Sequence, residues 1–180
     1  MKKLIIPVLA LLAIAIAPGA YAQTKMVGGA AMYPTKNIVE NAVNSKDHTT
    51  LVAAVKAAGL VETLSSAGPF TVFAPTNEAF NKLPAGTVET LVKPENKATL
   101  TKILTYHVVA GKLSAADLWA KVKAGKAGLT TVQGGKLWVK AQGKKLYLVD
   151  EKGGKSWITI ADVNQSNGVI HVVNTVLMPK

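Results

Sequence analysis

The feature of this sequence that most restricts its fold is a change of hydrophobic spacing near residue 129. Before it, "TTLVAAVKAAG" (49–59) and "PENKATLTKILTYHVV" (94–109) carry apolar residues every three or four positions, which predicts helices. After it, "KLWVK", "KLYLV" and "KSWITI" alternate between apolar and polar residues, which predicts strands joined by glycine-containing turns. Helices followed by strands favour an α+β domain over repeated βαβ units.

Short signals place further elements between these segments. "GPFTVFAP" is rich in β-branched and aromatic residues and predicts a strand that ends at Pro75. Thr76 or Asn77 is suited to cap a short helix that follows this strand. "SAAD" (114–117) resembles a capping box and predicts the start of another short helix.

The first residues predict export. Lys2 and Lys3 precede an apolar run, and "PGAYA" ends in a small-x-small pattern, as in a secretory signal peptide covering residues 1–22. The run is shorter than the roughly 18 apolar residues of a spanning helix. We therefore expect cleavage, a periplasmic or extracellular protein, and no membrane span in the remaining chain. Residues 23–33 are rich in glycine and alanine and are expected to form a flexible lead-in to a domain over 34–178.

The composition restricts the partners. The chain has no cysteine, so an exported form depends on burial rather than disulfides for stability. Lys2 and Lys3 leave with the signal peptide, and the 10 acidic residues then face a clear excess of basic ones, all lysine. Lysine lacks the planar fork with which arginine recognises bases. The charge favours attraction to anionic polymers over sequence-specific binding of nucleic acid.

Catalytic and metal sites are not indicated. The chain has no cysteine nucleophile, no Gly-x-Ser-x-Gly elbow and no His-x-x-x-His pair. We therefore predict no enzyme, no metal and no cofactor. His171, in the apolar run "NGVIHVVNTVLMP", is expected to be a buried residue whose ring nitrogens are hydrogen-bonded. That run is apolar on both alternating faces, which predicts a strand covered on both sides. His48, in the polar stretch "SKDHTT", is expected to be exposed.

Three ordered segments carry a family resemblance. "TVFAPTNEAF" (71–80) and "NGVIHVVNTVLMP" (167–179) resemble the two signature segments of the fasciclin-like domain, and "TYHVV" (105–109) resembles its tyrosine–histidine element. The resemblance implies helices packed on a wedge of strands, in exported proteins that are linked to adhesion and have no enzymatic activity. In animal members the tyrosine–histidine element is tied to integrin binding. Tyr106 and His107 match it, and because the leader looks bacterial we expect a structural role here.

The strands after residue 129 also predict a binding surface. Their aromatic residues fall on the polar phase of the alternation, in phase with lysines. If the strands are neighbours, a lysine-rimmed aromatic face results, suited to stacking on sugars and to attracting acidic polymers. If helices or the lead-in cover it, the same aromatics are ordinary core residues. The residues of this predicted ligand surface are Lys136, Trp138, Lys140, Lys145, Tyr147, Lys155 and Trp157.

Two functional interpretations follow from the sequence. The first is an exported binding module that contacts cell-surface or matrix material, either protein or polysaccharide, including anionic polysaccharide. The second is a periplasmic carrier that holds a small hydrophobic ligand such as haem in a cleft between helices and strands.

Overall fold

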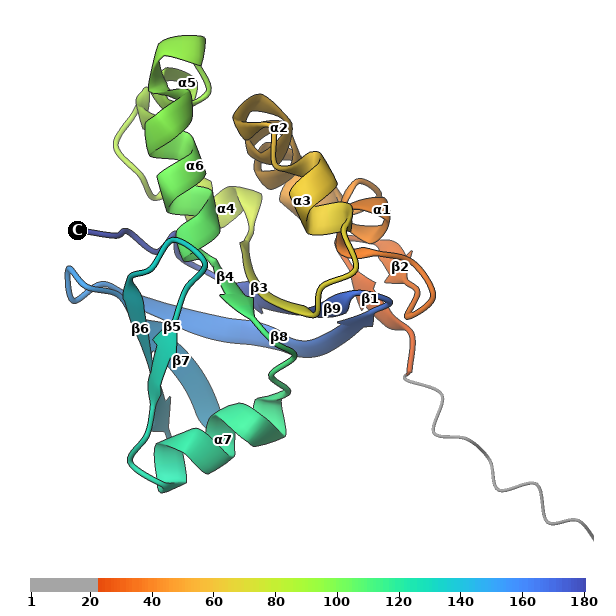
Figure 1. Ribbon diagram of the computed structural model, residues 1–180, viewed down its shortest axis with the longest axis vertical. Helices are drawn as coiled ribbons and strands as arrows, with labels where there is room; N and C mark the ends of the chain where they lie inside the picture. Colours follow the sequence, from red (N-terminus) through yellow and green to blue (C-terminus); the bar gives the residue numbers. More distant parts are fainter. Residues whose placement is uncertain (1–22) are drawn as a thin grey trace, which may run out of the picture.

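A seven-stranded sheet with the order β4-β3-β9-β8-β7-β6-β5 organises the molecule (Figure 1). The structure, a computed structural model, describes residues 23–180, so the predicted signal peptide lies outside the described residues. The strands are β1 (Lys25–Val27), β2 (Ala30–Met32), β3 (Phe70–Pro75), β4 (Val108–Ala110), β5 (Gly128–Thr130), β6 (Lys136–Gln142), β7 (Lys145–Val149), β8 (Lys155–Gln165) and β9 (Gly168–Val173). The helices are α1 (Ile38–Ala42), α2 (Thr49–Ala58), α3 (Val61–Ser65), α4 (Asn77–Asn81), α5 (Thr87–Leu91), α6 (Lys97–Tyr106) and α7 (Ala115–Lys123).

The parallel pair of β3 and β9 lies at the centre. These strands pair residue by residue, from Phe70 with Gly168 to Pro75 with Val173. β4 and β8 flank them with antiparallel pairing. Every residue of β9 and every residue of β3 after Phe70 is buried, so both faces of this pair are covered, as the unbroken apolar pattern of the last strand predicted.

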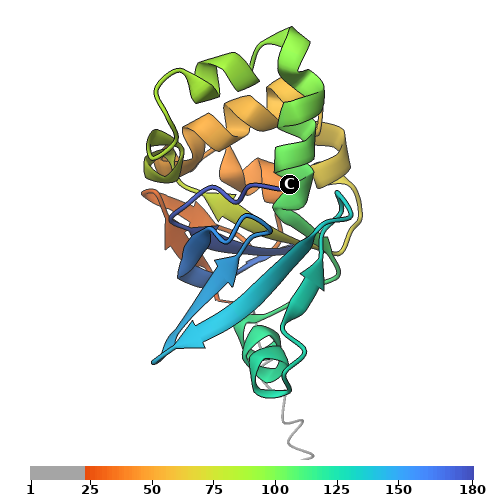
Figure 2. The same ribbon diagram turned by 90° about the vertical axis from the view of Figure 1, so that its left-hand side faces the viewer.

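The helices and the sheet enclose two apolar cores. Helices α1 to α6 gather on one side of β3 and β9, while α7 lies at the other end of the molecule (Figures 1 and 2). Val72 and Val172 point to the first core, under the helices. Phe73 and Val173, the next residues along the same strands, point to a second core that the curled sheet and α7 enclose.

The far strands of the sheet almost close it into a barrel. Val109, in β4, forms an isolated bridge with Thr131, just after β5. The Val132 N–H also donates to the Val108 carbonyl at 2.7 Å. The expected α+β class is confirmed, and the near-closed sheet explains why β6 and β7 bury one face and leave the other outside.

Several local predictions are confirmed. Helix α2 ends at Gly59, whose φ of 72° is the left-handed conformation favoured by glycine. Thr76 caps α4 by accepting from the Ala79 N–H at 3.3 Å. Ser114 and Asp117 form the capping box that begins α7.

The segment expected to be a flexible lead-in is instead a hairpin that packs on the domain. β1 and β2 pair antiparallel around Gly28 and Gly29, and Val27 and Met32 are both buried in the first core. Positive φ angles at both glycines suit this tight turn. The segment was misinterpreted because glycine and alanine give little strand signal, although the apolar residues on either side of the turn fill the core.

Asn167 links the start of the central pair to the helices. Its side-chain Oδ1 accepts from the Ile38 N–H at 3.0 Å, at the start of α1. Its Nδ2 donates to the carbonyls of Leu64 and Ser66, both at 2.8 Å. One side-chain amide, in the turn before β9, thus forms hydrogen bonds with three backbone groups of the helical layer.

We expect Asn167→Ala to lower the free energy of unfolding by about 3 kcal/mol, because each lost bond leaves a buried backbone group without a partner. Urea unfolding followed by circular dichroism measures this change. Asn164→Ala is the matched control, since Asn164 makes a single side-chain bond of 3.3 Å, to the Asp162 carbonyl. Equal losses in the two variants would contradict the bridging role of Asn167.

Candidate functional site

The outer surface of β6, β7 and β8 brings together the lysines and aromatic residues that shared one phase in the sequence. Lys140 pairs with Tyr147, and Tyr147 pairs with Trp157, so these residues form a row across three strands. The structure thus makes the three strands neighbours, which the predicted ligand surface required. The lysine–aromatic face consists of Lys136, Trp138, Lys140, Lys145, Tyr147, Lys155 and Trp157.

The aromatic rings of the face are held in place and remain partly accessible. The ring centres of Tyr147 and Trp157 lie 4.7 Å apart with their planes tilted by 41°. Lys155 Nζ lies 5.8 Å from the centre of the Tyr147 ring. Tyr147 and Trp157 are half-buried, while Trp138 is 39% exposed. The packed pair is therefore a fixed platform, and Trp138 is the most accessible ring on this face.

The lysines give the face a positive charge. Lys140, Lys145 and Lys155 are exposed, as is Lys136, whose Nζ donates to Thr130 Oγ1 at 2.6 Å. The outward positions of the three strands hold no acidic residue. Glu151, in the turn after β7, accepts the Lys136 backbone N–H at 2.9 Å through Oε1, at the edge of the face. The face can attract an anionic partner without an internal carboxylate competing for its lysines.

A cleft beside the face contains residues that the sequence patterns did not single out. β7 pairs with β8 only over Tyr147–Val149, and β8 then shifts register and follows β9. An open cleft of about 690 Å³ lies where the strands part. Trp157 belongs to both the face and the cleft, and Trp119, Lys144 and Asn174 line the cleft with it. Trp119 comes from α7, and only the folded topology brings this helix beside the gap.

Tyr106 and His107, the matched tyrosine–histidine element, are both buried. Tyr106 Oη donates to the Lys136 carbonyl at 2.6 Å and accepts the Glu151 N–H at 3.0 Å. Burial raises the pKa of Tyr106 to about 12. His107 Nδ1 contacts the Ile103 carbonyl at 2.8 Å, and Nε2 accepts the Leu177 N–H at 3.0 Å. The pair fastens the end of α6 to the β6 and C-terminal segments and offers no side-chain atom to a partner.

His171 lies fully buried in β9 with both ring nitrogens engaged. Nδ1 accepts the Asp162 N–H at 3.2 Å, and Nε2 donates to the Leu113 carbonyl at 2.7 Å. The ring also stacks on Phe73, with 5.7 Å between ring centres. Burial lowers the pKa of His171, which keeps the ring neutral at neutral pH. These contacts leave no ring nitrogen free for catalysis or for a metal.

His48 does not match its sequence interpretation, because it is 3% exposed rather than on the surface. The 3₁₀ turn over Lys46–His48 leaves Lys46 and Asp47 outside and turns the imidazole inward. The β1–β2 hairpin packs against this turn, with the Lys46 N–H donating to the Gly28 carbonyl at 3.1 Å. The polarity of the neighbours in sequence therefore did not predict burial.

Residues 23–180 lack two other kinds of feature. Nowhere in this range do three histidine, cysteine or acidic side chains come together as a group that could hold a metal ion. The helices of the same range include none with the length and apolar character needed to cross a membrane.

Comparison with known proteins identifies the family. The model of the fasciclin domain matches residues 46–179. The chain belongs to the fasciclin domain family. It is 49% identical over 160 residues to the protein sll1483 of Synechocystis, covering 87% of this chain and 81% of the relative. It is 36% identical over 190 residues to the immunogenic protein MPB70 of Mycobacterium bovis, covering 95% of this chain and 91% of that protein.

A solved structure shows the same fold. A fasciclin domain pair from the insect cell adhesion molecule fasciclin I superposes with a TM-score of 0.71 at 18% identity. The match covers 79% of this chain and 51% of the insect chain, so this protein spans about half of that domain pair. The fasciclin fold that the signature segments predicted is thereby confirmed, with both segments in the central strands β3 and β9.

The buried histidines give this fasciclin domain a defined response to acid. Burial lowers the pKa of His107 to about 4, whereas the pKa of a histidine in the unfolded chain lies near its ordinary value of 6.5. Between these values the unfolded chain binds a proton that the folded chain does not, so stability falls as the pH decreases. We expect the titration of His107 alone to lower the free energy of unfolding by about 2 kcal/mol between about pH 7 and pH 5.

Urea unfolding of the native protein and of His107→Gln at both pH values measures this contribution. Glutamine retains hydrogen-bonding capacity and does not titrate, so the loss of stability between the two pH values should shrink by about that amount. Asp117 and Glu151 have pKa values held below their usual range by hydrogen bonds, and they titrate below this window. An unchanged pH dependence in His107→Gln would show that other groups are responsible.

Proposed function

We propose that this fasciclin-domain protein is exported and acts without catalysis as an adhesion module. Its lysine–aromatic face would contact cell-surface or matrix material, and acidic polysaccharide is the partner class that suits it best. The single observation that carries this proposal is the row Lys140, Tyr147 and Trp157 across β6, β7 and β8. It combines a fixed aromatic surface with cations in one place.

The physical fit to an acidic sugar polymer has two parts. Aromatic faces with amphipathic edges stack on the apolar faces of sugar rings. Exposed lysine ammonium groups attract carboxylate or sulfate groups without demanding a fixed bidentate geometry, which suits a repeating and flexible polymer. Trp138 and the Tyr147–Trp157 pair supply the first contribution, and the surrounding lysines supply the second.

The cleft extends the proposed contact around the edge of the sheet. Trp119 and Trp157 offer two indole rings in the cleft. Lys144 and Lys145 also line it, and Asn174 supplies a hydrogen-bonding amide. A chain of sugars lying across the face would enter this cleft at Trp157, which lines both. Several sugar units would then contribute to binding, and weak individual contacts would add up.

The tyrosine–histidine element does not supply the proposed contact. Tyr106 is fully buried and His107 is 2% exposed, with their polar atoms bonded to backbone groups. A partner that used these side chains directly would have to disrupt the end of α6. Their position supports a structural role in this chain.

The experiment is retention on immobilised acidic and neutral polysaccharides over a series of salt concentrations. We expect retention on the acidic polymer, part of which survives salt that screens exposed charges. The double variant Trp138→Ala/Trp157→Ala should bind about tenfold more weakly, because buried aromatic anchors commonly dominate the energy of an interface. Thermal unfolding followed by circular dichroism verifies that the variant is folded.

Tyr33→Ala is the matched control. Tyr33 is 46% exposed and has Lys36 Nζ 5.3 Å from its ring centre, so it is a lysine-paired aromatic away from the face. Retention that Trp138→Ala/Trp157→Ala leaves unchanged would overturn the role of the aromatic face. Retention that salt abolishes completely would assign binding to lysine charge alone. No retention on any polysaccharide would instead favour a protein partner.

A further inference from the structure

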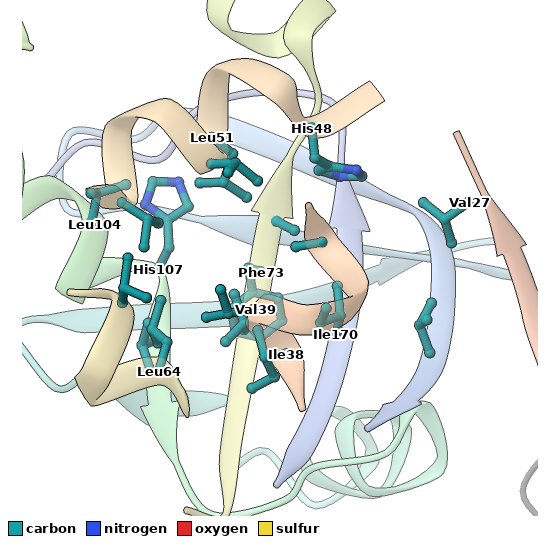
Figure 3. Close-up of a pocket in the computed structure, with 18 of the residues that line it drawn as sticks. Val27, Ile38, Val39, His48, Leu51, Leu64, Phe73, Leu104, His107 and Ile170 are labelled. Atoms are coloured by element: carbon teal, nitrogen blue, oxygen red, sulfur yellow. The ribbon is translucent and has the colours of Figure 1, made fainter. Parts of the chain in front are cut away.

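An apolar cavity lies between the helical layer and the central strands, on the other side of β3 and β9 from the second core. Its free volume is about 50 Å³, and its walls come from α1, α2, α3, α6, β3 and β9 (Figure 3). Most of the lining side chains are aliphatic and buried, including Leu51, Val55 and Ile170. The lining also includes the exposed Lys56 and the half-buried Val52, both on α2, and the half-buried Val39 on α1, and these residues mark the side where the cavity comes nearest to solvent.

His48 contributes a buried polar atom without a partner to this apolar wall. Its Nδ1 contacts Ser45 Oγ at 2.9 Å. Its Nε2 is the one buried side-chain nitrogen or oxygen within residues 23–180 that has no hydrogen-bond partner. Burial lowers the pKa of this ring, and the backbone of Ala74 partly offsets that effect. Buried polar atoms in proteins are nearly always paired, so this atom calls for an explanation.

The other histidine of the lining differs from His48 in the pairing of its ring nitrogens. His107 also lines the cavity, on the opposite side from His48 in the view of Figure 3. Both of its ring nitrogens are occupied, by the Ile103 carbonyl and the Leu177 N–H. His48 is therefore the only histidine of the cavity that can make a new hydrogen bond without breaking one within the fold.

We propose that this cavity binds a small apolar molecule that carries one hydroxyl group, with the hydroxyl paired to His48 Nε2. The lining offers dispersion contacts and excludes water from the rest of the ligand. A hydroxyl both donates and accepts, so it matches Nε2 whichever ring nitrogen carries the proton. A purely apolar ligand would fill the space and leave Nε2 without a partner.

The volume sets the size of the ligand. One water needs about 10–15 Å³ of such space, so the cavity accommodates about three to five groups of that size. A dry apolar cavity known to take up benzene has a volume of about 150 Å³, about three times larger. A short-chain alcohol with about three carbon atoms therefore fits, whereas a substituted aromatic ring and the much larger haem do not. The structure supports the carrier interpretation for a small ligand and not for haem.

The experiment titrates the full chain, isotopically labelled, with 1-propanol and with 1-chloropropane, and follows the methyl resonances by NMR. The two probes share a three-carbon chain, which ends in a hydroxyl group in one and in a chlorine atom in the other. We expect saturable shifts at Val55 and Ile170, with 1-propanol binding about fivefold more tightly because it pairs the free imidazole nitrogen. In His48→Leu the two probes should bind equally well.

Ala42→Leu and Ala53→Leu locate the site. Ala42 lines the cavity, so its enlargement fills the space and should abolish binding of both probes. Ala53 is exposed on α2 and is not part of the lining, so the same enlargement there should leave binding unchanged. Circular dichroism verifies that each variant is folded.

Each contrary outcome overturns a stated part of the proposal. The absence of saturable shifts at the lining residues, or binding that Ala42→Leu does not weaken, would remove the cavity as a ligand site. Equal affinities for 1-propanol and 1-chloropropane in the native protein would contradict the pairing of a ligand hydroxyl with His48. This last comparison needs no variant, so it stands even if His48→Leu fails to fold. The results are independent of the lysine–aromatic face, which lies on other strands.

Discussion

The parallel pairing of β3 with β9 is the constraint on which the rest of this structure depends. The two strands come from distant parts of the chain and pair over six positions, from Phe70 with Gly168 to Pro75 with Val173. Their approach is so close at Gly168 that an added Cβ would lie 2.0 Å from the Phe70 carbonyl oxygen, so no larger residue fits without moving the backbone. Because side chains alternate along each strand, this one pair forms the boundary of both cores and fixes which residues enter each. The signature segments of the family are thus the parts of the chain whose pairing borders both cores.

This boundary also separates the two candidate binding regions. The lysine–aromatic face depends on β6, β7 and the start of β8, whose inner residues Leu137, Val139 and Leu148 pack in the second core. The cavity at His48 depends on the helical layer and belongs to the first core. β3 and β9, which are paired along their length, contribute alternate residues to the two cores. β4 does the same with Val108 and Val109. A surface contact and a small bound molecule can therefore coexist in one domain of this size without competing for residues.

Much of the fold could be predicted because local signals and tertiary packing agree. The changes of hydrophobic period, the capping box at Ser114 and the stop at Gly59 each depend on nearby residues. The strand phase that gathers Trp138, Tyr147 and Trp157 on one side was also visible, since alternation needs no knowledge of the partner strand. What could not be predicted depends on contacts between distant segments. The hairpin around Gly28 is held by a core formed far along the chain, His48 is buried by that hairpin, and Trp119 reaches the cleft only because α7 lies beside the gap between β7 and β8.

The histidines show how burial alone fails to define function. All three of them are buried, and burial lowers the pKa of each, yet His107 and His171 have both ring nitrogens in hydrogen bonds to the main chain. For those two, the imidazole joins segments that regular secondary structure leaves unpaired, and its neutral form is part of the fold. His48 differs because one nitrogen has no partner, which costs the folded state about 1–3 kcal/mol relative to a paired group. An aliphatic side chain at this position would avoid that cost and still fill the wall of the cavity. A ligand hydroxyl would offset the same cost on binding, so the unpaired nitrogen favours a polar ligand over an empty or purely apolar cavity.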